Sequence, residues 1–317
     1  MATAITYTAF GGPEVLTLTE IQVPAPAADE VAVRVTAAGV NPLDHKLRSG
    51  ARASGPITDP RRVGSDGAGV VTAVGADVEG FRAGDEVVVF GAAGVYASDI
   101  VVPAAQLAPR PPQVSAAEGA ALGVPIGTAY QTLRSLDVRA GDTLLVHGGS
   151  GSVGQAVIQF AVLWGVTVLA TTSTRRAERV TALGGTALRY DDPEGGTLTE
   201  RVRAAAPGGV TAVIDIAGTD EAIQTSLDLV ADRHRIVTLV RGKDAAGLGI
   251  RAFLGGSPRP LNAQEQAWRA EAIPVALHLM AAGRFAVEVG PRLPLADAAA
   301  AHLLVEAGVD GKVVLLP

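Results

Sequence analysis

Three glycines at positions 149, 151 and 154 have the spacing G-x-G-x-x-G, which can support phosphate binding. The apolar segment TLLVHG (143–148) comes before them, and VGQAVIQFAVLW (153–164), which has helical periodicity, comes after them. We expect Gly149 to permit a tight turn, Gly151 to let a pyrophosphate approach, and Gly154 to let the helix pack closely on the strand. This order of elements predicts a dinucleotide site, because amide groups at a helix N-terminus attract anions.

The glycine spacing by itself is weak evidence, since the chain contains 38 glycines. A strand–helix turn without a ligand is the alternative interpretation. The strand before the turn and the helix after it favour the dinucleotide site. The predicted contacts of this turn are Gly149, Ser150, Gly151, Ser152, Val153 and Gly154.

The residues after the next predicted strand indicate which dinucleotide binds. NAD sites carry an acidic residue about 20 positions after the first glycine, where it binds the ribose hydroxyls. This chain has no acidic residue between Asp142 and Glu178, and it places Ser173, Arg175 and Arg176 after the strand. Hydroxyl and guanidinium groups form charge-assisted hydrogen bonds with a 2′-phosphate, so the pattern predicts NADP(H). A solvated helix face of arginines is the alternative.

Composition limits the possible partners. The formal net charge of −6 at pH 7 argues against nucleic acid and anionic membranes. Cysteine is absent, which excludes disulfides and thiolate–metal sites and fits a reducing compartment. The N-terminal residues lack the basic start and apolar core of a signal peptide, and no apolar segment is long enough to span a membrane. We therefore expect a cytoplasmic protein that acts on a small molecule.

The elements that position these residues change character near residue 119. Before it, short valine-rich segments separated by Gly, Pro and Asp predict a strongly curved sheet or partial barrel. After it, apolar strands alternate with helices, which predicts a parallel sheet covered on both faces. Pro274 should bend or break the helix that contains it. The predicted strands are 31–37, 68–75, 85–90, 96–103, 143–148, 166–172, 186–190, 209–218, 234–240 and 311–317, and the predicted helices are 153–164, 175–185, 198–206, 220–230, 263–283 and 295–308.

Several segments in the same order resemble one enzyme family across almost the whole chain. AAGVNPLDHKLRSG (37–50) carries an Asn-Pro-x-Asp pattern, and the segment 63–88 carries G-x-D-x-x-G-x-V followed by a G-D-x-V turn. GTAYQTL (127–133), GGSGSVGQAVIQFA (148–161) and the C-terminal segment 294–316 complete the pattern. The chain thus resembles medium-chain dehydrogenase/reductases, in the zinc-free quinone oxidoreductase (zeta-crystallin-like) and enone reductase branch.

The resemblance implies a fold of two lobes. A GroES-like β-barrel catalytic domain would comprise 1–118 plus 266–317. An α/β Rossmann domain with a doubly wound parallel sheet, 119–265, would be inserted into it and bind NADP(H). The active site of such proteins lies in the cleft between the lobes. Members often form homodimers through edge strands, so we expect a homodimer, with 234–240 as the candidate edge.

The same resemblance indicates chemistry without zinc. Zinc-dependent members place cysteine at the position of Asn41, and a His-Glu pair at the positions of Ser65 and Asp66. Without a metal to polarise an alcohol or aldehyde, the predicted reaction is conjugate reduction. Hydride would pass from NADPH to a quinone or an α,β-unsaturated carbonyl, and hydrogen-bond donors would stabilise the charge that develops on oxygen.

Family positions imply five site residues outside the glycine turn. Asn41 should lie near the nicotinamide ribose or the substrate oxygen, and Thr128 should contact the nicotinamide amide. Lys46 and Tyr130 are candidates for electrophile or proton source, with water as a further proton source. Tyr190 should lie at the adenosine phosphate end. The alternatives are a turn-forming role for Asn41, a solvated charge at Lys46 and a packing role for Tyr130.

Other polar residues are expected to be structural. We expect Asp44 and Asp66 to accept hydrogen bonds from the backbone or from arginine. We expect His45 to lie at the surface, and His147, beside the glycine turn, to be satisfied by the backbone.

Two other functions stay open. An enoyl-thioester reductase acting on a carrier-bound substrate would need a basic entrance, which Arg48, Arg52, Arg61 and Arg62 would supply. A non-catalytic NADPH-binding sensor or structural protein would retain the fold without turnover, since fold does not determine function. Lys46 stands where quinone reductases often have tyrosine, which hints at altered chemistry.

Overall fold

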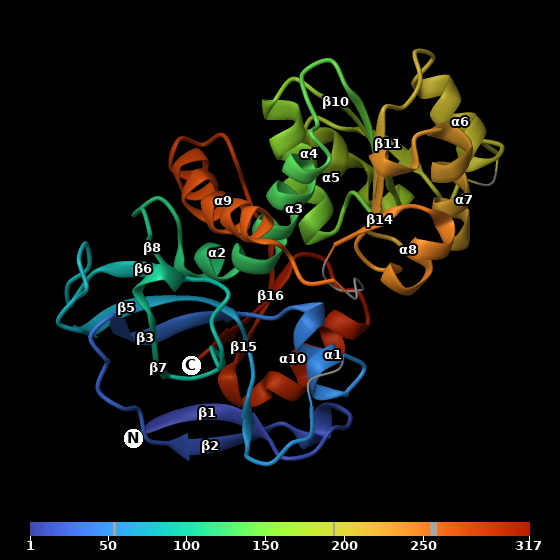
Figure 1. Ribbon diagram of the computed structural model, residues 1–317. Helices are drawn as coiled ribbons and strands as arrows, with labels where there is room; N and C mark the ends of the chain where they lie inside the picture. Colours follow the sequence, from blue (N-terminus) through green and yellow to red (C-terminus); the bar gives the residue numbers. More distant parts are fainter. Residues whose placement is uncertain (53–54, 193, 254–258) are drawn as a thin grey trace. The chain divides into compact units, whose positions relative to one another are not determined.

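The computed structural model describes residues 1–52, 55–192, 194–253 and 259–317. The chain forms two compact units (Figure 1). The first unit comprises Met1–Val124 and Ile273–Pro317, and the inserted unit comprises Pro125–Ala272. Every helix in the described part of the chain is too short or too polar to cross a membrane.

The first unit is built on two sheets. Its larger sheet has the strand order β15-β16-β3-β5-β6-β8, and β7 also pairs with β3. Its smaller sheet has the order β2-β1-β4. Alternating valines bury one face of β3, which explains why a valine-rich segment forms the longest strand. The elements are β1 (Ala2–Tyr7), β2 (Thr17–Ile21), β3 (Glu30–Gly39), α1 (Pro42–Arg48), β4 (Arg61–Arg62), β5 (Asp66–Val74), β6 (Glu86–Val89), β7 (Asp99–Pro103), β8 (Leu107–Pro109), α2 (Ala116–Ala120), β15 (Val289–Pro294), α10 (Ala298–Glu306) and β16 (Lys312–Leu316).

The C-terminal strand returns to the N-terminal part of the first unit. β16 lies antiparallel to β3 with Val314 opposite Gly39, and β5 lies on the other side of β3 with Asp66 opposite Gly39. Gly39 is needed because a Cβ there would lie 2.0 Å from the carbonyl oxygen of Ala120. Pro42 is the first residue of α1, where its fixed φ favours helix initiation. The register therefore places the end of β3 beside β16 and beside the start of β5, directly before α1 begins.

The inserted unit contains six parallel strands in the order β11-β10-β9-β12-β13-β14. The direction of winding reverses between β9 and β12, so right-handed crossovers place α4 and α5 on one face and α6 and α7 on the other. Sheets of this kind bind ligands where the winding reverses, at the carboxyl ends of the strands. The elements are β9 (Thr143–His147), α4 (Ser152–Leu163), β10 (Thr167–Thr172), α5 (Ala177–Ala182), β11 (Thr186–Arg189), α6 (Leu198–Ala205), β12 (Ala212–Asp215), α7 (Asp220–Leu229), β13 (Ile236–Thr238), α8 (Gly242–Leu248) and β14 (Arg251–Ala252). Two further helices, α3 (Gly123–Ser135) and α9 (Ala263–Ala281), contain the boundaries between the two units.

The structure corrects one sequence-based expectation about these elements and narrows a second. The segment 234–240 does not form the sheet edge, because β13 lies between β12 and the two-residue strand β14. Of the two effects expected at Pro274, a bend or a break, the break does not occur, since α9 continues through the proline to Ala281. Residues on both sides of the proline, including Ile273 and Leu277, are buried. Their burial offsets the hydrogen bond that proline cannot donate.

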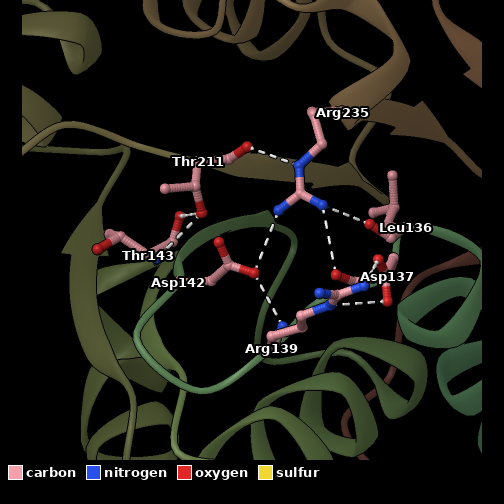
Figure 2. A network of polar contacts seen from close by, with 7 residues as sticks. All are labelled: Leu136, Asp137, Arg139, Asp142, Thr143, Thr211 and Arg235. Carbon is pink, nitrogen blue, oxygen red and sulfur yellow. Dashed lines mark hydrogen bonds and ion pairs between the residues drawn. The ribbon is translucent and has the colours of Figure 1, made fainter.

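Arg235 ties together the segments in which β9, β12 and β13 begin (Figure 2). Its guanidinium donates to the carbonyl oxygens of Thr211 at 3.1 Å and Leu136 at 2.5 Å, and to Asp142 Oδ2 at 3.2 Å. Asp142 also accepts the backbone N–H of Arg139 at 2.8 Å. Burial opposes the ionisation of Asp142, but these hydrogen bonds outweigh it and lower its pKa. The network therefore joins the amino-terminal ends of these three strands, at the end of the sheet opposite to the glycine turn.

We expect Arg235→Met to lower the free energy of unfolding by about 2–4 kcal/mol, because several acceptors lose a charged donor. Urea unfolding of the full chain, followed by circular dichroism, measures this change. Arg139→Ala is the control, because its ion pair with Asp137 is exposed and should contribute much less to stability. Equal losses in the two variants would contradict the role assigned to Arg235.

Candidate functional site

Asn41 is the centre of a buried polar cluster in the first unit. Its Nδ2 donates to Asp66 Oδ2 at 2.8 Å, and its Oδ1 accepts a hydrogen bond from Lys312 Nζ. Its backbone N–H donates to Asp44 Oδ2 at 2.8 Å, which also accepts the hydroxyl of Tyr96 at 2.8 Å. We call these five residues the Asn41 cluster. Each exposes at most 4% of its surface.

Local backbone features bring the members of the Asn41 cluster together. The antiparallel register of β3 and β16, continued past Gly39, places Asn41 opposite Lys312. Asp66 begins β5 and also accepts the N–H of Val124 at 2.8 Å. At Gly123 a Cβ would lie 2.0 Å from Asp66 Oδ1, so glycine makes room for the carboxylate. Asp66 thus accepts from the backbone, as the sequence predicts.

Burial shifts the acid–base properties of the cluster. It raises the pKa of Asp44 to about 6, although the hydrogen bonds from Asn41 and Tyr96 oppose the shift. It lowers the pKa of Lys312, while the nearby carboxyl groups of Asp66 and Asp44 oppose that shift. Burial and Asp44 raise the pKa of Tyr96 well above its ordinary value, so this phenol stays protonated. The cluster therefore holds one amine beside two carboxyl groups, all of them buried.

Lys46 lies on α1 but outside the Asn41 cluster. It is half-buried, five residues after Asn41, which is more than one helical turn. The adjacent His45 is partly buried, with Nδ1 3.9 Å from a carboxylate oxygen of Glu306. His45 therefore faces α10 rather than open solvent. Lys46 and Asn41 are close in the sequence, but the structure has no hydrogen bond between their side chains within the described residues.

The glycine turn of the inserted unit has the close contacts that its spacing predicts, with one correction. Gly148, at φ +85°, makes the left-handed turn, so this role does not belong to Gly149. At Gly149 a Cβ would lie 2.5 Å from the Cβ of Ala170, and at Gly154 a Cβ would lie 2.3 Å from the Gly148 oxygen. At Gly151 the nearest atom would be 3.8 Å away. Two glycines therefore serve packing, and Gly151 leaves space for a ligand.

The first turn of α4 completes this site. Gly151 is the N-cap, and Ser152 and Val153 are the first two helical residues. The N–H groups at such a position have no acceptor within the helix and lie at the positive end of its dipole. They are suited to bind a pyrophosphate.

Arginines follow β10 next to the glycine turn. Ser173 precedes a short 3₁₀ turn that contains Arg175 and Arg176. Arg176 Nη2 donates to the carbonyl oxygen of Ser150 at 3.3 Å, so its guanidinium lies against the turn. Arg175 is exposed. The structure thus brings together the predicted pyrophosphate and 2′-phosphate residues within the inserted unit.

Asp191 lies beside these arginines and was not predicted from the sequence. Its carboxylate accepts the backbone N–H and the hydroxyl of Thr174, both at 2.9 Å. The hydroxyl bond is the main cause of the lowered pKa of Asp191. The preceding Tyr190 exposes 55% of its surface, and its N–H donates to the Thr172 oxygen at 3.0 Å. The position of Asp191 after a strand that neighbours β10 is the signal that could have found it.

Thr128 and Tyr130 lie on α3, and both are largely buried. The Tyr130 hydroxyl donates to Glu271 Oε1 at 2.8 Å, and its ring packs edge-on against Phe160 with centroids 5.2 Å apart. Burial and the Glu271 carboxylate raise the pKa of Tyr130 to about 12. A phenol held in this way is a poor proton donor, so the geometry favours the packing alternative.

His147 ends β9, directly before the glycine turn, and is fully buried. Neither ring nitrogen has a hydrogen-bond partner within the described residues, so the expectation of a backbone partner is wrong. Burial lowers the pKa of His147 to about 4, which keeps the ring neutral at pH 7.

The pH dependence of stability tests this burial. The folded-state pKa of His147 lies below the ordinary value of 6.5, so the stabilising effect is complete above pH 6.5 and is lost as pH falls toward 4. We expect His147→Leu to reduce the slope of unfolding free energy against pH in this range by up to about 1.4 kcal/mol per pH unit. Urea unfolding at several pH values measures the slope. His234→Gln, at an exposed position, is the control, and an unchanged slope in His147→Leu would refute the assignment.

The described residues contain no group of three or more His, Cys, Asp or Glu side chains placed to hold a metal ion. Among family models, the alcohol dehydrogenase GroES-like domain matches residues 27–112 and the zinc-binding dehydrogenase model matches 191–315.

Similar proteins match over nearly the full length. A quinone oxidoreductase of Rattus norvegicus is 32% identical and covers 99% of this chain and 97% of its own length. Among solved structures, an Escherichia coli quinone oxidoreductase complexed with NADPH has a TM-score of 0.83 at 27% identity, covering 99% of this chain and 100% of its own. A mycobacterial protein complexed with NADPH has a TM-score of 0.82 at 32% identity, covering 100% of both chains. These matches confirm the predicted combination of a GroES-like domain and a Rossmann sheet.

Proposed function

Because the chain belongs to the zinc-free quinone oxidoreductase branch of the medium-chain dehydrogenase/reductase superfamily, we propose that it reduces a quinone or another α,β-unsaturated carbonyl compound with NADPH. The observation that carries the proposal is the glycine turn, open at Gly151, with Arg176 against it. An anion-binding helix start beside a guanidinium suits a phosphorylated dinucleotide.

Each end of NADPH has candidate partners in this chain. The N–H groups of Ser152 and Val153 would hold the pyrophosphate, and Ser173 with the two arginines would hold the 2′-phosphate. Thr128 would contact the nicotinamide amide, and Tyr190 would lie at the adenosine phosphate end. Asp191 would hold the 2′-phosphate segment in place through Thr174.

The first unit would supply the groups that act on the acceptor. NADPH supplies a hydride, and the charge that remains then develops on the carbonyl oxygen of the acceptor. Asn41 Nδ2 would donate to that oxygen, which stabilises the charge as it forms. Lys46 or water would then supply the proton to carbon or oxygen. We assign Tyr130 to packing because its hydroxyl is bonded to Glu271.

The enoyl-thioester alternative loses part of its support in the structure. Its basic entrance would include Arg48, but this side chain is 3% exposed. Arg48 donates to the carbonyl oxygen of Gly11 at 3.2 Å and to Glu306 at 2.8 Å. A guanidinium engaged in this way does not bind the phosphate of a carrier. We therefore place the free-carbonyl reaction first and keep the carrier-bound substrate, with Arg52, Arg61 and Arg62 at its entrance, as the alternative.

A panel of hydride acceptors tests the proposed reaction. We expect NADPH oxidation with quinones and enones, and much slower oxidation with saturated aldehydes, because the described residues offer no set of ligands for a metal ion that would polarise an isolated carbonyl. NADPH fluorescence reports cofactor binding in the same samples. Binding without oxidation by any acceptor would favour the non-catalytic alternative and would contradict the proposal.

The cofactor preference tests the arginine assignment. We expect the double variant Arg175→Ala, Arg176→Ala to weaken NADPH binding by about 100-fold, because two charge-assisted contacts are lost. NADH binding should change little, since NADH lacks the 2′-phosphate. Fluorescence titration measures both dissociation constants, and Arg203→Ala on the exposed side of α6 is the control. A similar loss for both cofactors would disprove the 2′-phosphate role.

A further inference from the structure

Lys312 is a buried cation that the proposed reaction does not yet use. It begins β16 and exposes 4% of its surface. Its Nζ donates to Asn41 Oδ1, and its charge interacts with both Asp66 and Asp44. Gly39 gives its stem room, because a Cβ there would lie 3.0 Å from Lys312 Cε. A lysine placed so deeply beside a polar side chain needs an explanation beyond sheet pairing.

The neighbours of Asn41 determine the orientation of its amide group. An ammonium can only donate hydrogen bonds, so Lys312 must face the amide oxygen. An ionised carboxylate can only accept them, so Asp66 must face the amide nitrogen. The contact with Asp66 uses one of the two Nδ2 hydrogens. Asn41 therefore has one amide hydrogen left for a ligand.

The ammonium also changes the strength of that hydrogen as a donor. A cation on the amide oxygen draws electron density from the nitrogen, and hydrogen bonds in a chain polarise one another. The effect is larger in a buried site than in water. Tyr96 donates to the same oxygen of Asp44 as the Asn41 backbone, and the N–H of Val124 donates to the same oxygen of Asp66 as Asn41 Nδ2. These second donors help to hold both carboxyl groups beside Asn41.

We propose that Lys312 is a positioning residue: its ammonium orients and polarises the Asn41 amide, whose remaining hydrogen then binds the carbonyl oxygen of the acceptor. This inference rests on the proposed function, because it assigns Asn41 to the oxygen on which charge develops. Lys312 acts through Asn41 and does not touch the acceptor.

The absence of cysteine from the chain permits a test of the charge itself. Lys312→Cys would carry the only thiol, which 2-bromoethylamine converts into a lysine analogue when the thiolate displaces bromide. 1-Bromopropane gives an adduct of the same length without the charge. Both reactions are done on the unfolded chain, which is then refolded. Lys243→Cys, at an exposed position on α8, passes through the same steps as the control.

The two adducts should differ in kcat. We expect the aminoethyl adduct to recover most of the wild-type kcat with NADPH and a quinone, and the propyl adduct to stay at least about tenfold lower. The KM for the quinone and the dissociation constant of NADPH should change less than kcat. Equal kcat values for the two adducts would overturn the inference and assign Lys312 to packing.

A measurement on the unmodified protein covers the case in which the adducts do not refold. In wild-type protein, one of the two Asn41 side-chain ¹H–¹⁵N signals should shift when a quinone is added with NADP⁺. An unmoved pair would overturn the inference. Failure of the proposed function would give a different result, because the wild-type protein would then not oxidise NADPH with any quinone or enone.

Discussion

The geometry of the first unit depends on the burial of one ammonium group beside two carboxyl groups. A buried charge without a nearby opposite charge is strongly destabilising, so Lys312 and Asp66, which are joined through the side chain of Asn41, favour the burial of each other. Their proximity requires β16 to lie beside β3 in the observed register. A shift of one residue would turn Lys312 to the other face of the sheet and leave Asp66 without its cation. The sheet register and the charge cluster therefore specify each other, and both hold Asn41 in one orientation.

In the inserted unit, charged and polar groups have different roles at the two ends of the parallel strands. Where the strands begin, Arg235 donates hydrogen bonds to two carbonyl oxygens and a carboxylate, so these groups are satisfied by contacts within the protein. Where β9 ends, the glycine turn and the start of α4 leave N–H groups without helical acceptors. Hydrogen bonds thus stabilise the sheet at the end where the strands begin, and N–H donors stay available for the proposed ligand at the other end. The sheet therefore does not depend for its stability on the groups of the proposed binding site.

Local patterns in the sequence predicted the parts of the structure that depend on near neighbours. The strand, glycine turn and helix around Gly151 are contiguous, and so are the arginines after β10. The Asn41 cluster was not predictable in this way, because Lys312 lies 271 residues from Asn41 and its segment predicts only a closing strand. The expectation of a backbone partner for His147 was wrong for a related reason, because strand periodicity predicts burial but does not say whether a polar partner lies nearby. Tertiary contacts decide such cases.

Asp191 shows why cofactor preference depends on the position of an acidic residue and not on its presence. A carboxylate at the end of β10 would bind ribose hydroxyls and repel a 2′-phosphate. Asp191 follows β11 instead, and two hydrogen bonds from Thr174 direct its charge into the backbone of the arginine-containing turn. The carboxylate therefore stabilises the segment that presents Arg175 and Arg176. An acid that would oppose a 2′-phosphate in one position supports the proposed 2′-phosphate segment in the other, and the strand that it follows determines which role it takes.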